Sequence, residues 1–140
     1  MGTGRGIDGL NQYLIEVSDR PFSWHTHDCF MFTNEAWRRM HGHGWADDWA
    51  GRYVEGGLYM KRDRLREVFG FRDFVSAIDS KLQRSGRFPP RGALVATKKK
   101  QRWAVGLALG ICTGPHAAFL GQSGTIYLPL DDVEHSWVNR

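Results

Sequence analysis

The chain has 140 residues, of which 41% are hydrophobic and 13% aromatic, and its formal net charge is +4. This length suits one domain, and so much apolar material excludes disorder of the whole chain. Two cysteines, Cys29 and Cys112, are too few for a disulfide framework, so we expect folding or assembly in a reducing compartment.

The N-terminal residues 1–6 are rich in glycine and contain no apolar stretch of the signal-peptide kind. We therefore expect a flexible arm at residues 1–6 and a single domain at residues 7–140. The longest mostly apolar run, residues 104–112, is far too short to cross a membrane. No membrane-spanning segment is expected.

Two amphipathic helices are predicted near the N-terminus. Apolar residues at helical spacing predict a helix over residues 10–17, and Pro21 follows it. Asp28 is a residue type that caps helix N-termini, and apolar side chains from Cys29 to Met40 recur on one face of a helix. The pattern therefore predicts Cys29 in the first turn of the second helix, on its inward face.

The remainder of the chain divides into a helical part and a strand-rich part. After a turn-rich segment, apolar spacing predicts helices over residues 59–69 and 72–82. Beyond Arg91, short apolar runs between turn signals predict strands at residues 93–96, 103–112, 116–120, 125–128 and 136–139. Helices first and strands afterwards predict an α+β fold.

A basic run at residues 98–102 connects the first two predicted strands. Such a run is typical of a solvated turn, and contact with phosphate or an acidic partner is the alternative. No interleaved aromatic residues accompany the run, so we do not expect a nucleic-acid-binding protein.

The position of Cys29 suggests a chemical role. The free N–H groups and the dipole at a helix N-terminus stabilise a thiolate, so the pKa of a cysteine placed there can fall. A thiolate is the reactive form, and Cys29 is therefore a candidate nucleophile. The alternative is a small core residue, because free cysteine is among the most buried residue types.

The segment Trp24-His25-Thr26-His27-Asp28-Cys29, followed by an amphipathic helix, resembles the Asp-Cys helix start of NlpC-type papain-like cysteine peptidases. Further matching features follow in chain order: Trp37, Arg52-Tyr53, Gly92, the sequence Gly-Ile-Cys-Thr-Gly at residues 110–114, and Trp137. Over residues 20–140 the chain resembles most closely a family of short, uncharacterised bacterial and phage proteins related to these peptidases. The resemblance implies a papain-like fold in which N-terminal helices pack on a C-terminal antiparallel sheet of about five short strands.

In the peptidases that the chain resembles, a histidine at the start of a central strand is the general base. Two registers match that strand here, and they place Ala104 or Ala108 at the position of the base. His116 matches an orienting position, and His116, His25 and His27 are candidate substitute bases. A general base contributes roughly two to four orders of magnitude to the rate, so the resemblance implies a domain that has lost most or all peptidase activity.

The resemblance also implies a location. NlpC-type domains of phages belong to the tail tip, so we expect a structural component of a phage or phage-like tail tip, assembled in the host cytoplasm and carried in the virion. Other tail-tip proteins and peptidoglycan are the expected partners, and no cofactor is expected. The alternative is an active cell-wall cysteine endopeptidase, with Cys29 as nucleophile, that cuts peptidoglycan stem peptides during DNA delivery.

A second alternative is a metal-binding module. His25, His27 and Cys29 alternate along the chain and offer nitrogen and sulfur ligands of the kind that zinc accepts. His41 and His43 lie about 20 Å further on if the helix is continuous, so the two groups cannot share one ion.

The six tryptophans divide into two predicted groups. We expect four of them to pack in the core: Trp24, Trp37, Trp103 and Trp137. Trp45 and Trp49 lie four residues apart beside two aspartates, so we expect them to form an exposed anchor for a protein partner.

Overall fold

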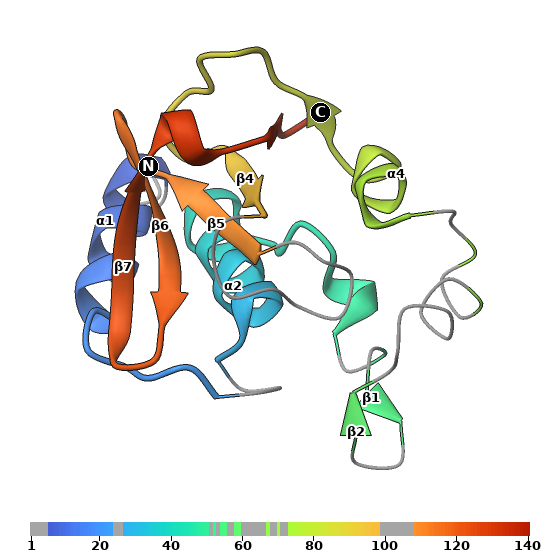
Figure 1. The fold of residues 1–140 in the computed structure, drawn as a ribbon, viewed down its shortest axis with the longest axis horizontal. Coiled ribbons are helices and arrows are strands. Elements are labelled where there is room, and N and C mark those ends of the chain that lie inside the picture. Colours follow the sequence, from blue (N-terminus) through green and yellow to red (C-terminus); the bar gives the residue numbers. More distant parts are fainter. Residues whose placement is uncertain are drawn as a thin grey trace.

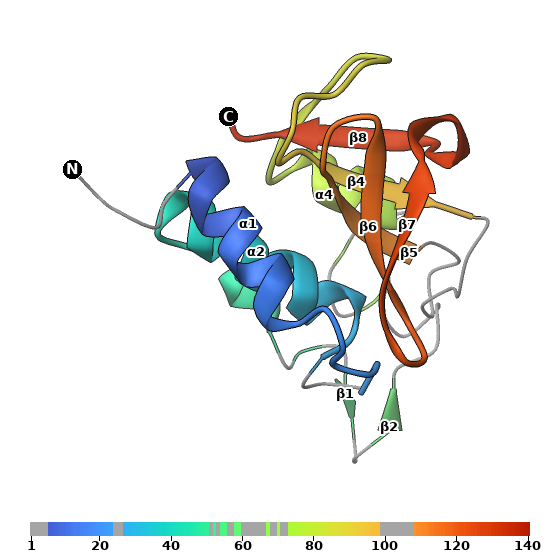
Figure 2. The same cartoon turned by 90° about the vertical axis from the view of Figure 1, so that its left-hand side faces the viewer.

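The computed structural model describes residues 6–23, 27–50, 73–98 and 108–140, together with residues 52, 54–55, 58–59, 67 and 70. Within these residues the two N-terminal helices form one layer and an antiparallel sheet forms the other (Figures 1 and 2). The predicted α+β class is confirmed. No described helix is both long and apolar enough to cross a membrane.

The α-helices whose bounds lie within the described residues are α1 (Gly6–Glu16), α2 (Cys29–His41) and α4 (Phe74–Asp79). They confirm three of the predicted helices, with differences at the ends. Of the helix predicted over residues 59–69, Glu67 is helical, whereas Tyr59 belongs to strand β2 (Leu58–Tyr59), which pairs with β1 (Val54–Glu55). Most of that prediction lies outside the described residues, as does the predicted arm except Gly6, which begins α1.

The main sheet is antiparallel throughout, and its strand order is β3-β8-β4-β5-β6-β7. Its strands are β3 (Gln83–Arg84), β4 (Leu94–Thr97), β5 (Ala108–Cys112), β6 (His116–Gly121), β7 (Gly124–Pro129) and β8 (His135–Val138). The sequence predicted five strands of this sheet and missed β3, as it missed the separate pair β1 and β2. Because β3 has only two residues, both exposed, it gives no alternating apolar pattern.

Helix α2 begins and ends as its sequence predicts. The Asp28 carboxylate accepts a hydrogen bond from the Met31 N–H at 2.9 Å, which satisfies one of the free donors of the first turn. Gly42 ends the helix in the left-handed region with φ 87°, a conformation that favours glycine, and its N–H donates to the Arg38 carbonyl. These two caps fix the length and therefore the position of Cys29 at the start of the helix.

The buried face of α2 packs against α1 on one side and the sheet on the other (Figure 2). Phe32 stacks on Tyr13 of α1 with ring centroids 5.9 Å apart. Leu109 and Ile111 of β5 belong to the same buried cluster as this helix face. The opposite face of the sheet has its own smaller cluster. Its fully buried members are Ala93, Val95, Ala108, Cys112, Ala117 and Phe119.

The β7 edge of the sheet is partly covered by the chain itself. The N–H of Thr125 donates to the carbonyl of Ser18, in the connection after α1, at 3.0 Å. A side chain at Gly124 would lie 2.4 Å from the same carbonyl, so only glycine permits this approach. The other end of β7 is Pro129, which has no N–H to offer.

The close approach of β5 and β6 depends on Gly110. A Cβ at this position would lie 2.5 Å from the Ala118 carbonyl oxygen and 2.7 Å from the Phe119 ring. We expect Gly110→Ala to lower the free energy of unfolding by about 1–3 kcal/mol, as overpacked sites do, in urea denaturation.

Gly86→Ala is the matched control for this prediction. Nothing lies within 4 Å of a Cβ at Gly86, so its stability should stay within about 0.5 kcal/mol of the wild type. Equal midpoints for the two variants would contradict the close approach of the strands.

Candidate functional site

The candidate site is the start of α2, where Cys29 faces strand β5. Cys29 is only 8% exposed and belongs to the same buried cluster as Leu109. Asp28 before it is 1% exposed and is engaged in capping the helix. The sulfur therefore lies between a helix N-terminus and the backbone of a strand, as the sequence predicts for its helical position and inward face.

The environment of the sulfur favours the neutral thiol. Burial raises the pKa of Cys29 to about 12, and the neighbouring Asp28 carboxylate adds to the rise. The backbone N–H groups of Leu109, Cys29 and Phe30 act in the opposite direction, because each stabilises a thiolate, but burial outweighs them. The expectation that the pKa of Cys29 falls is therefore wrong: the N–H groups of the first turn do lower it, but the loss of solvent raises it by more.

His27 is close to Cys29 in sequence but packs elsewhere. Its ring contacts Phe32 edge-on, with centroids 6.0 Å apart, and only 3% of the residue is exposed. Backbone hydrogen bonds in both directions tie His27 to Ser23. In the described part of the chain no hydrogen bond or electrostatic interaction joins His27 to Cys29, and Nε2 of His27 is buried without a partner.

The structure describes only one of the two candidate positions for the general base. Ala104 lies outside the described residues. Ala108 begins β5, but its side chain belongs to the cluster on the far face of the sheet, whereas Leu109 belongs to the cluster of Cys29. Successive side chains of a strand point to opposite faces, so a side chain at position 108 points away from the sulfur.

His116 does not meet Cys29 either. It is the exposed first residue of β6, where it pairs with Pro129. The register of β5 and β6 sets Ile111 beside Ala118, so the residue of β6 opposite Leu109 lies four positions beyond His116. Four residues of strand span about 13 Å, and His116 is thus too far from the sulfur to orient or replace a base there.

The proposed zinc ligands form no cluster in the described residues. His25 lies outside them, and the described chain contains no group of three or more histidine, cysteine or acidic side chains that could hold an ion. His27 and Cys29 point to different neighbours, Phe32 for the first and Leu109 for the second.

The prediction that Trp45 and Trp49 form an exposed anchor is wrong, because both are 5% exposed. The Trp45 indole donates to the Thr33 hydroxyl at 3.1 Å and packs edge-on against Phe30. Trp49 packs edge-on against Trp45, and their aromatic area pulls the segment after α2 into the core. Trp37 and Trp137 are buried as predicted, and Trp24 and Trp103 lie outside the described residues.

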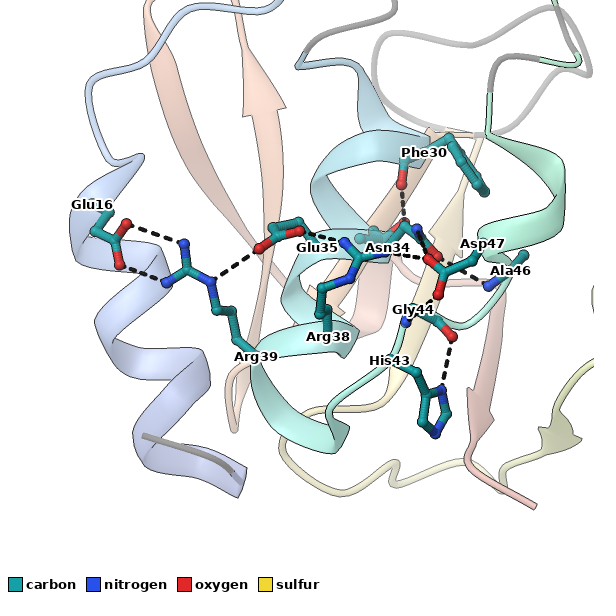
Figure 3. Close-up of polar contacts among 11 residues, drawn as sticks. Glu16, Phe30, Asn34, Glu35, Arg38, Arg39, His43, Gly44, Ala46 and Asp47 are labelled. Atoms are coloured by element: carbon teal, nitrogen blue, oxygen red, sulfur yellow. Dashed lines mark hydrogen bonds and ion pairs between the residues drawn. The ribbon is translucent and has the colours of Figure 1, made fainter. Parts of the chain in front are cut away.

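A clamp of polar side chains holds this segment to α2, and the sequence did not predict it. The amide of Asn34 donates to the Asp47 carboxylate at 2.8 Å and accepts from the Ala46 N–H at 3.0 Å (Figure 3). The other carboxylate oxygen of Asp47 accepts from the Gly44 N–H at 3.0 Å, and Arg38 binds the same carboxylate. The only signal in the sequence is a polar residue beside the apolar stripe of the helix.

A groove of about 460 Å³ lies on the described part of the chain, lined by residues 84–89 and by residues of the segment 130–136. Neither Cys29 nor Leu109 lines it, so this groove is separate from the candidate site.

The clamp can be tested with Asn34→Ala. The substitution leaves the buried Ala46 N–H without its acceptor, so we expect a loss of about 1–3 kcal/mol in the free energy of unfolding. Glu35→Ala is the control, because Glu35 makes partly exposed ion pairs with Arg38 and Arg39, worth at most about 1 kcal/mol. An Asn34→Ala chain as stable as the control would contradict the clamp.

The burial of His27 makes stability depend on pH. Burial lowers the pKa of His27, Arg20 lowers it further, and Asp28 opposes both. As the pH falls, His27 of the unfolded chain therefore gains its proton at a higher pH than His27 of the folded chain. The contribution of the buried, neutral His27 to stability is complete above about pH 6.5 and is lost as the pH falls below that value. We expect the stability difference between His27→Gln and the wild type to shift in favour of the variant between pH 7 and pH 5, measured by urea denaturation. A stability difference that stays constant from pH 7 to pH 5 would contradict this effect of His27.

Comparison with known proteins adds a family but no activity. The chain matches the family model described as "Domain of unknown function (DUF6950)" over residues 7–138. None of the curated proteins compared with the chain matches it. Because the match spans nearly the whole chain, including α2 with Cys29 and all strands of the main sheet, the protein belongs to this DUF6950 family.

Proposed function

We propose that the protein is a catalytically inactive structural component of a phage or phage-like tail tip, with an NlpC-type papain-like fold. The observation that carries the loss of catalysis is the state of Cys29, a buried neutral thiol that no described imidazole contacts. The location comes from the resemblance of the sequence to NlpC-type proteins, which the order of the elements supports.

The arrangement of elements supports the papain-like part of the proposal. Cys29 is the first residue of a buried helix, and this helix packs on β5 of an antiparallel sheet that follows it in the chain. The resemblance implies this order and this packing.

One feature of the site favours the alternative function, a cell-wall cysteine peptidase. Three backbone N–H groups, from Cys29, Phe30 and Leu109, surround the sulfur and would stabilise negative charge there. An active enzyme would also need access to the sulfur and a base beside it. The described residues supply neither, because Cys29 is buried and the β5 side chain on its face is leucine.

The two functions predict different thiol chemistry. With a pKa of about 12, on the order of one chain in 10⁴ or 10⁵ carries the Cys29 thiolate near pH 7.5. We expect a thiol-directed probe to label Cys29 of the native chain no faster than Cys112, which is also buried and has a raised pKa. Mass spectrometry of the digested chain assigns the label to each cysteine.

Labelling in urea is the control, because both cysteines must react fully once the chain unfolds. A peptidoglycan digest with the wild type and Cys29→Ala completes the test, and we expect neither protein to release peptides. Rapid labelling of native Cys29, or a digest that Cys29→Ala abolishes, would overturn the proposal in favour of the peptidase.

A further inference from the structure

Two histidines at the end of α2 lie side by side although their sequence spacing alone does not bring them together. His41 is the last residue of the helix and His43 follows one residue later. In a continuous helix, residues two apart do not face each other. The left-handed conformation of Gly42 reverses the chain, and the ring centroids of His41 and His43 come to 6.4 Å, with 32° between the ring planes.

The ring of His43 is held in one orientation. Its Nδ1 lies 2.9 Å from the carbonyl oxygen of Gly44, and a carbonyl can only accept, so Nδ1 carries the proton and donates. The other nitrogen, Nε2, is then left with its lone pair. A hydrogen bond of this type to a backbone carbonyl is the usual means by which proteins orient a histidine that binds a metal.

The polar clamp supports this orientation. Gly44 is bound through its N–H to the Asp47 carboxylate, which the amide of Asn34 also holds. A side chain at Gly44 would collide with Asp47 and Asn34, at 2.2 Å and 2.3 Å, so the turn has little freedom. Figure 3 shows the His43 ring directed away from the clamp.

His41 is oriented by a different contact. Its ring packs against the buried Trp37 ring, with centroids 5.0 Å apart, and remains exposed on its other side. Two imidazoles that share an ion at about 2.0–2.1 Å from each nitrogen have ring centroids roughly 5 Å apart in tetrahedral geometry and roughly 6.5 Å apart when the nitrogens lie on opposite sides of the ion. The observed 6.4 Å lies at the upper end of this range, so the exposed His41 ring must approach His43 by about 1 Å when a tetrahedral ion binds.

We propose that His41 and His43 form a two-histidine site for a divalent transition-metal ion such as Zn²⁺. Neutral imidazole nitrogens suit zinc, nickel and copper, whereas magnesium and calcium prefer oxygen. The described residues supply no third ligand, so the remaining positions of the ion take water or a donor group of a molecule that binds it. The site is independent of Cys29, which lies at the other end of a helix of 13 residues.

Zinc titration of the untagged chain of 140 residues by calorimetry tests the site. We expect one Zn²⁺ per chain in the wild type, and a loss of affinity of about tenfold or more in both His41→Ala and His43→Ala. Ni²⁺ should bind to the same positions, so its titration should show the same dependence on the two histidines.

His116→Ala is the matched control, because His116 is also an exposed histidine but lies at the start of β6. It should bind Zn²⁺ as the wild type does, and His25→Ala should do the same. Thermal unfolding of each variant in the absence of metal checks that these substitutions leave the fold intact. No binding to the wild type at millimolar Zn²⁺, or an equal loss of affinity in His116→Ala or His25→Ala, would overturn the proposal. Since the titration uses no peptidoglycan and no thiol probe, its failure is distinct from failure of the proposed function.

Discussion

The packing of α2 against β5 is the constraint on which the rest of the structure depends. One face of the helix carries Cys29, Phe32 and Trp37 into the main core, and Leu109 and Ile111 receive it from the sheet. The same packing that buries this apolar surface also removes water from the Cys29 sulfur. Stability and thiol reactivity are therefore opposed here, and the structure favours stability.

The parts of the fold that the sequence predicted are those with strong local signals. Helix α2 has an aspartate cap, a long apolar stripe and a terminal glycine, so both its position and its inward face follow from the sequence. Strand β3 has two exposed residues and no pattern, since its pairing with β8 depends on the chain returning from a distance of more than 50 residues. Short edge strands of this kind have no local residue pattern from which they could be predicted.

The candidate site was predictable in position but not in chemistry. The helix start identified Cys29, whereas the pKa of its thiol depends on how closely β5 covers it, and that is a tertiary property. Trp45 and Trp49 show the same limit, because turn-like residues around them suggested exposure while the Asn34 clamp draws the segment inward. Which of Ala108 and Leu109 faces Cys29 likewise depends on how β5 is placed in the sheet, and the sequence alone does not give that.

The covered edge at β7 restricts how this protein can associate with others. Open strand edges recruit further strands and lead to sheets that grow from chain to chain. Here Ser18 occupies one end of the edge and Pro129 interrupts the other, so a neighbouring strand finds no continuous row of donors and acceptors. An oligomer that adds protomers through this side of the domain would rely on shape and side-chain contact instead of a sheet shared between chains.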